Sequence, residues 1–190
     1  MGEMESLVCK ARSIRRFDAS KPVDKEMLLT LVNLAHLAPN GNNAQVLRYH
    51  VTTDVHEYGR IFEKLGWAAR LKDWKGPEEA ERPTGYIVIL APSPIAPIRL
   101  IDAGIAAQTM QLGACELGLG SCMLKSFPAS IMEDLVLQDD GLEAILVMAF
   151  GYPDEEIILE QSSSPTDVAY WRDEQDIHHV PKLPLADVLV

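Results

Sequence analysis

A helix built largely from small residues most constrains how this chain can fold. The stretch from Asp102 to Glu116 repeats larger side chains at helical spacing on one face, namely Ile105, Thr109, Leu112 and Cys115. Its other faces carry small residues, namely Gly104, Ala106, Ala107, Gly113 and Ala114. Small side chains allow other backbones to approach closely, as where a helix is buried between subunits. Gly118-Leu119-Gly120 predicts the end of this helix.

Two continuous apolar runs predict the centre of a sheet. Tyr86 to Ala91 and Ala144 to Phe150 are apolar throughout, as is typical of strands that are covered on both faces. Shorter strands are expected at 49–53 and 121–124, and helices at 4–11, 24–38, 58–65 and 129–135. With 190 residues the chain is long enough for one domain with a substantial core, so a single domain over 1–190 is expected.

Charge and composition argue against several classes of function. The formal net charge of -11 is unfavourable for non-specific nucleic-acid binding, because phosphates would be repelled by most of this surface. No apolar run approaches the roughly twenty residues that span a bilayer, so no membrane segment is expected. The three cysteines form no C-x-x-C pair, which favours a reducing, cytoplasmic setting. His178-His179 lacks the H-E-x-x-H spacing of zinc ligands, and no metal site is predicted.

A basic cluster near the N-terminus contrasts with this acidic composition. Arg12, Ser13, Arg15 and Arg16 fall within five residues. Guanidinium groups offer a rigid fork of donors that matches phosphate oxygens, and a serine adds a short neutral donor. The cluster is therefore either a site for an anion or the solvated basic end of a helix, and its own residues leave both interpretations open.

Three other segments also have two interpretations each. Pro39 to Gln45 contains three Asn and a Gln, and is either a helix stop with a turn or a binding loop. Trp67 to Trp74 is an irregular excursion that either lines a pocket, as a lid would, or forms a satellite hydrophobic cluster. Residues 154–190 are acidic and rich in Ser and Pro, with little periodicity. Such an extension is either disordered or wraps around something, for which a partner subunit is the obvious candidate.

Four motifs in the same order resemble the FMN-dependent nitroreductases. Ala11 to Phe17, followed by Pro22-Val23, is similar to the family opening Arg-Arg-Ser-hydrophobic-Arg-x-aromatic with its Pro-Val. Ala38 to Tyr49 resembles the block Ala-Pro-Ser-x-x-Asn-x-Gln-Pro-Trp-x-Phe. Asp102 to Cys122 is similar to Asp-x-Gly-x-x-x-Gln with its small-residue helix and Gly-Leu-Gly, and the Gly-Tyr-Pro turn follows at 151–153. The resemblance covers nearly the whole chain apart from the Trp-rich excursion and the acidic extension.

The resemblance implies a fold, a cofactor and a reaction. The fold is the α+β nitroreductase fold, a mixed central sheet flanked by helices, in an intertwined homodimer with two FMN sites at its interface. The extension 154–190 would wrap the partner subunit. NAD(P)H would give hydride to flavin N5 and a nitroaromatic or quinone would take the electrons, in a ping-pong mechanism that demands no acid-base side chain. Other branches of the family dehalogenate tyrosines or fragment flavin, and a flavin-binding module without turnover, or a dimer with a decayed site, is a further alternative.

The resemblance also assigns roles to residues. Ser13 and Arg12 would bind the FMN phosphate, while Arg15 would reach the phosphate or the N1/O2 edge of the ring. Ala11 occupies the first Arg position of the family motif, so Arg12 or Lys182 would substitute for that donor. The second block would approach the flavin of the opposite subunit through Pro39, Asn40, Gly41, Asn43 and Gln45. Near flavin N5 the resemblance places the backbone of Met123, Leu124, Lys125 and Ser126.

Overall fold

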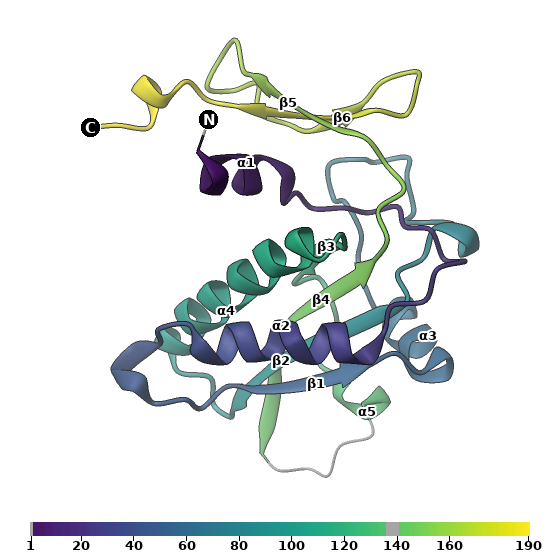
Figure 1. Ribbon diagram of the computed structural model, residues 1–190, viewed down its shortest axis with the longest axis vertical. Coiled ribbons are helices and arrows are strands. Elements are labelled where there is room, and N and C mark those ends of the chain that lie inside the picture. Colours follow the sequence, from purple (N-terminus) through teal and green to yellow (C-terminus); the bar gives the residue numbers. More distant parts are fainter. Residues whose placement is uncertain (1, 136–140) are drawn as a thin grey trace.

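The computed structural model describes residues 2–135 and 141–190 (Figure 1). Its helices are α1 (Glu3–Lys10), α2 (Lys25–Leu37), α3 (Val55–Glu63), α4 (Pro97–Glu116) and α5 (Ile131–Asp134). Its strands are β1 (Arg48–Thr52), β2 (Gly85–Pro92), β3 (Gly120–Leu124), β4 (Leu142–Gly151), β5 (Ile157–Gln161), β6 (Trp171–Arg172) and β7 (His178–Lys182). Short 3₁₀ turns occur at Gly41–Asn43, Glu79–Glu81 and Leu185–Asp187. No helix within these residues is both long and apolar enough to cross a membrane.

The central sheet has the strand order β1-β2-β4-β3. All three pairings between these strands are antiparallel, and Ser13 adds an isolated parallel bridge to Ser121 at the β3 edge. The regular parallel pairing lies elsewhere, between β5 and β7 of a second sheet whose order is β5-β7-β6. The α+β class and the helices flanking a central sheet are confirmed. The parallel component of the central sheet is limited, in the described residues, to that single bridge.

The two continuous apolar runs are central because the sheet is covered on both faces. Along β2, Ile87, Ile89 and Ala91 belong to one buried cluster with residues of α2 and α4. The alternate residues, Tyr86, Val88 and Leu90, belong to a second buried cluster with residues of α3, α5 and the segment before α2. Successive strand residues point to opposite faces, so a strand with a core on each side needs an apolar residue at every position. The prediction of buried central strands is confirmed for β2 and for the C-terminal half of β4.

Small residues bring α4 close to α2. A Cβ atom added to Gly113 would lie 2.5 Å from Leu34 Cδ1 and 3.1 Å from Leu31 Cδ2, so only glycine fits there without a shift. Buried alanines of α4 form the rest of this contact, whereas Ile105, Leu112 and Cys115 are only partly buried. The helix also begins earlier than predicted, at Pro97 rather than Asp102. Proline suits the first turn of a helix because no intrahelical partner is needed for its missing N–H, so Pro97 begins α4.

The C-terminal segment forms a sheet of its own, which is shown in Figure 1 as a layer beyond α1. Of the two interpretations of this segment, disorder is therefore wrong. Its periodicity is weak because β6 has two residues and β5 has no buried position. Asp54 and Asp24, by contrast, cap α3 and α2 through their carboxylates, a simple local signal. Contact of residues 154–190 with a partner subunit stays a prediction.

His179 ties the strands of this sheet to the turn before β7. Its Nε2 lies 3.2 Å from Asp173 Oδ2 and its Nδ1 lies 3.1 Å from Glu160 Oε2. These hydrogen bonds, that to Asp173 first and that to Glu160 second, raise the pKa of His179 above its ordinary value of 6.5. The ring also stacks on Trp171 with centroids 4.2 Å apart.

This arrangement predicts a pH-dependent contribution to stability. Because the folded pKa of His179 is the higher one, its contribution is fully present below the unfolded value and is lost as the pH rises through the folded pKa. We expect His179→Gln to be less stable than the wild type in acid, with the gap closing as the pH rises. Urea unfolding of both proteins from pH 5 to 9 measures it. A gap that widens toward high pH would contradict this assignment.

Candidate functional site

The N-terminal basic cluster lies in an extended segment fixed by its apolar neighbours. Ile14 donates its backbone N–H to the Ser121 carbonyl (2.9 Å), and Phe17 donates to the Glu81 carbonyl (2.9 Å). Phe17 is fully buried against Gly151, where an added Cβ would lie 2.7 Å from the phenyl ring. With Ile14 and Phe17 held in the core, the polar residues between them are fixed in position. The cluster is therefore a built feature of the fold rather than a solvated helix end.

A cavity of about 280 Å³ opens beside this segment. The residues that line it come from the N-terminal segment, α4 and the C-terminal sheet: Arg12, Ser13, Arg15, Gln111, Ile157, Tyr170, His178, Val180 and Lys182. Four of them, Arg12, Ser13, Arg15 and Lys182, are predicted cofactor ligands from opposite ends of the chain. Among the residues that the structure describes, the lining includes three cationic side chains and no carboxylate. In a protein of net charge -11, such a lining is suited to an anion.

Arg15 is the cation most tightly held in this cavity. Its Nη1 donates to the Ser13 carbonyl (3.2 Å), and its guanidinium lies 4.7 Å from the centroid of the Tyr170 ring. Its Nε is buried and has no hydrogen-bond partner among the residues that the structure describes. A buried guanidinium with an unused donor is costly unless something accepts from it. Arg15 is thus oriented by the protein while keeping a donor free.

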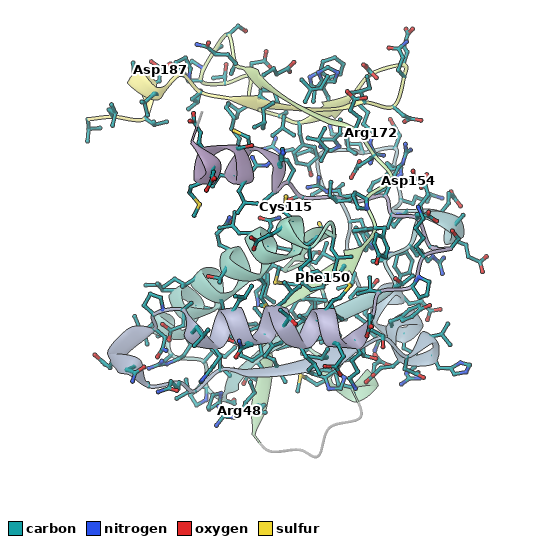
Figure 2. All side chains as sticks on the ribbon, in the orientation of Figure 1. Arg48, Cys115, Phe150, Asp154, Arg172 and Asp187 are labelled. Atoms are coloured by element: carbon teal, nitrogen blue, oxygen red, sulfur yellow. The ribbon has the colours of Figure 1, made fainter. Side chains whose placement is uncertain are left out.

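A buried carboxylate joins the N-terminal segment to the C-terminal sheet. The Glu155 side chain is 1% exposed and accepts from the backbone N–H groups of Arg15 and Arg16, the latter at 3.3 Å. Its other oxygen accepts from Arg172 Nη2 at 2.9 Å. Figure 2 labels Arg172 on the C-terminal sheet and Asp154 on the connection that leads from β4. Because this contact holds the two walls of the cavity together, Glu155 sets the shape of the site without lining it.

The cavity also holds a neutral histidine. His178 is fully buried, and its ring stacks on Tyr170 with centroids 5.3 Å apart. Burial, together with the positive charges of Arg15 and Arg172, lowers the pKa of His178 to about 4. At neutral pH the imidazole is therefore uncharged and carries one N–H.

The Asn-rich loop lies at the other end of α4. Gly41 donates its N–H to Asp102 Oδ1 (2.7 Å), near the start of the helix, whereas the cavity borders Gln111, about 14 Å further along the axis. Pro39, Asn40 and Gln45 line a separate small cavity of about 50 Å³. Positive φ angles at Asn42, Asn43 and Gln45 give the loop its shape, and the Asn40 side chain accepts from the Gln45 N–H (3.0 Å). A single chain does not bring this block to the basic cavity.

The residues of the chain from 9 to 152 match the model of the nitroreductase family. This span contains the basic cluster, the Asn-rich loop, α4 and the whole central sheet. The chain belongs to the nitroreductase family.

Three relatives illustrate the range of the family. Iodotyrosine deiodinase of Thermotoga neapolitana is 27% identical, over 82% of this chain and 91% of its own length. The 4-nitrobenzoate reductase of Pseudomonas putida is 23% identical, over 88% of this chain and 92% of its own length. Among solved structures, a Desulfovibrio desulfuricans nitroreductase in complex with FMN has a TM-score of 0.68 and 22% identity, covering 100% of this chain and 96% of its own. At that identity the structural match shows the nitroreductase fold.

The third predicted group follows the strand that the basic cluster touches. Ser13 bridges to Ser121, and Met123 to Ser126 continue from there along β3 and beyond it. None of these four residues lines the basic cavity. Lys125 lies over the Phe127 ring, with Nζ 5.2 Å from its centroid, and the Ser126 carbonyl accepts from the Gly66 N–H (2.7 Å). Their role near a flavin stays a prediction.

Sequence reasoning missed several residues that border the cavity: Gln111, Ile157, Tyr170, His178 and Val180. Gln111 lies among the small residues of α4 and was not predicted to be a site residue. The others lie in the C-terminal segment, for which no strands were predicted. A period-two pattern was nevertheless available, since His178, Val180 and Lys182 alternate along β7 and all border the cavity. Because Lys182 was a predicted ligand, the alternation along β7 would also have indicated His178 as a residue of the site.

The Trp-rich excursion packs partly into the core. Trp67 is 8% exposed and its ring lies 5.8 Å from that of Phe62, so it belongs to the second buried cluster. Trp74 is partly buried against the same cluster, and the centroid of its ring lies 4.5 Å from the Arg172 guanidinium of the C-terminal sheet. The interpretation as a hydrophobic cluster thus applies to both tryptophans, and Trp74 also borders a broad surface hollow with Arg16, Arg70 and Trp171.

Proposed function

We propose that this protein is an FMN-dependent oxidoreductase that transfers hydride from NAD(P)H, through flavin N5, to a nitroaromatic, quinone or related acceptor by a ping-pong mechanism. The observation that carries the proposal is the cavity lined by Arg12, Arg15 and Lys182, with no carboxylate from the described part of the chain, in a member of the nitroreductase family. The nitrobenzoate reductase among its relatives supports a nitroaromatic acceptor. The unpaired cysteines support a reducing, cytoplasmic setting.

The residues present fit FMN. Its phosphate carries close to two negative charges at neutral pH, which the cavity's cations can balance. Arg15, whose buried Nε has no partner among the described residues, and Ser13 would donate to the phosphate, while Arg12 and Lys182 line the same cavity and would add positive charge. Bound FMN supplies the redox chemistry, accepting two electrons from NAD(P)H and passing them to the second substrate. The protein's own residues bind the cofactor, orient it and exclude water around it.

The site is proposed to be completed by a second copy of the chain. About 280 Å³ is less than most cofactor pockets enclose, so one chain holds only part of the ligand. The Asn-rich loop, about 14 Å away along α4, would supply the remainder from the opposite subunit. Apolar side chains exposed near the start of α4, Ile98, Leu100 and Ile101, support a homodimer, because such residues on one helix are typical of an interface.

The proposal is tested by reducing the purified protein under anaerobic conditions. We expect bound FMN at one per chain, seen in the visible spectrum, and full bleaching by one equivalent of NADH or NADPH. Added FMN should raise the melting temperature of the apoprotein, since ligand that binds only the folded state stabilises it. Protein that neither carries nor gains flavin absorbance would rule the proposal out. Bound FMN that stays oxidised with both nucleotides would leave a flavin-binding module.

A second candidate reaction is reductive dehalogenation. The deiodinase is the relative with the higher identity of the two enzymes, 27% against 23%. Iodotyrosine and 4-nitrobenzoate assayed side by side with the reduced protein separate the two. Release of iodide with no loss of nitrobenzoate would favour dehalogenation, and the opposite result would favour the nitroreductase proposal.

A further inference from the structure

The wall of the basic cavity that the C-terminal sheet supplies lies outside the residues that match the family. The match ends at 152, whereas Tyr170, His178 and Lys182 follow it. The family model therefore does not describe this wall. The chain also lacks one donor of the family motif. Ala11 stands where the motif has an arginine, and Ala11 is buried and carries no donor side chain.

His178 is the least explained polar group in this wall. Its side chain is fully buried, and neither ring nitrogen has a hydrogen-bond partner within residues 2–135 and 141–190. Nδ1 lies 3.9 Å from Glu155 Oε2, too far for a hydrogen bond. Nε2, on the opposite side of the ring, is likewise unpartnered. Leaving such a buried group unsatisfied is unfavourable. His178 is one of the residues that line the cavity, so a ligand there can supply the missing partner.

The charges around His178 favour an anion as that ligand. Arg15 and Arg172 act on it most strongly, followed by His179 and Arg16, and the Glu155 carboxylate faces Nδ1. Glu155 is already occupied by Arg172 and by two backbone N–H groups. The ring stacks on Tyr170, whose hydroxyl accepts from the Arg70 N–H (3.4 Å). An uncharged imidazole in this setting has one N–H to donate.

We propose that His178 is a phosphate ligand of FMN, donating from Nε2, and that it compensates for the arginine absent at Ala11. The inference rests on the proposed function, since it assumes that FMN occupies the cavity. It adds a neutral donor to the charges of Arg12, Arg15 and Lys182. His178 and Lys182, which line the cavity from the same face of β7 as Val180, would then both bind this phosphate.

The test compares two flavins that differ only in the phosphate. Affinities for FMN and riboflavin are measured by quenching of flavin fluorescence, in the wild type, His178→Phe and His178→Gln. Phenylalanine keeps a ring against Tyr170 but removes both nitrogens, whereas a glutamine amide reaches about as far as Nε2. We expect His178→Phe to weaken FMN binding about tenfold and to leave riboflavin within about twofold. His178→Gln should restore FMN binding to within about threefold of the wild type.

Other outcomes overturn the proposal. Equal losses for FMN and riboflavin in His178→Phe would assign His178 a structural role, and unchanged FMN affinity would leave it without a role in binding. A measurement on the wild type does not depend on the variants folding: the imidazole ¹⁵N resonances of His178 should shift with FMN and not with riboflavin, and identical responses would contradict the assignment. A wild type that binds neither flavin would instead refute the proposed function, so the two failures are distinguishable.

Discussion

Glu155→Ala is expected to lower the free energy of unfolding by about 3–5 kcal/mol. The carboxylate is 1% exposed and accepts from Arg172, whose side chain is 8% exposed. Removing it leaves a buried guanidinium without its counter-charge and two backbone N–H groups, of Arg15 and Arg16, without an acceptor. Since the same contact joins the walls of the basic cavity, FMN affinity should fall as well. Urea unfolding followed by circular dichroism gives the free energy.

The neighbouring glutamate provides the control. Glu156 is exposed, so Glu156→Ala should change the free energy of unfolding by no more than about 0.5 kcal/mol. Glu155→Gln keeps an acceptor oxygen but removes the charge, and should fall between the two. If Glu155→Ala and Glu156→Ala were equally stable, the buried ion pair would contribute nothing and the C-terminal sheet would be held by other contacts.

The core of the fold could be predicted because its signals are local. An apolar residue at every position of β2 requires a cover on each face, and the Asp24 cap and the Gly118 turn mark helix ends through their own chemistry. The start of α4 was misplaced because Pro92, Pro94 and Pro97 lie close together, and proline can mark the end of a strand as well as the start of a helix. Pro97 is the first residue of α4, and no local pattern distinguishes it from the two prolines before it.

The candidate site was only partly predictable, for a related reason. Arg12, Ser13 and Arg15 are adjacent in sequence, and their clustering was evident against the acidic composition. Tyr170 and His178 join them through long-range contacts that depend on Glu155, a single glutamate within an acidic run. No local pattern distinguishes a glutamate that will be buried from its exposed neighbour Glu156. The two sides of the cavity meet only in three dimensions, so the sequence indicated an anion site without its second wall.

Arg15→Ala should weaken FMN binding about ten- to one hundredfold, whereas Arg16→Ala should leave it within about threefold. These adjacent arginines form a matched pair because they face different ways. Arg15 borders the cavity with a free Nε, while the Arg16 guanidinium pairs with Glu81 (3.3 Å) and Asp176 (3.2 Å) away from it. Each substitution removes one positive charge, so a general electrostatic effect would weaken both variants alike. Equal affinities in flavin titrations would contradict the assignment of Arg15.

Riboflavin separates the two roles that Arg15 could have. If its guanidinium binds the phosphate, Arg15→Ala loses FMN affinity and keeps riboflavin affinity, as proposed for His178. If the guanidinium faces the N1/O2 edge of the ring, the affinities for FMN and for riboflavin fall to a similar extent. In that case the reduction potential of the bound flavin should also fall, because a cation at that edge stabilises the negative charge that reduction places there. Arg15→Lys keeps the positive charge but removes the fork of donors. The reduction potential of the flavin should therefore change less than the FMN affinity does.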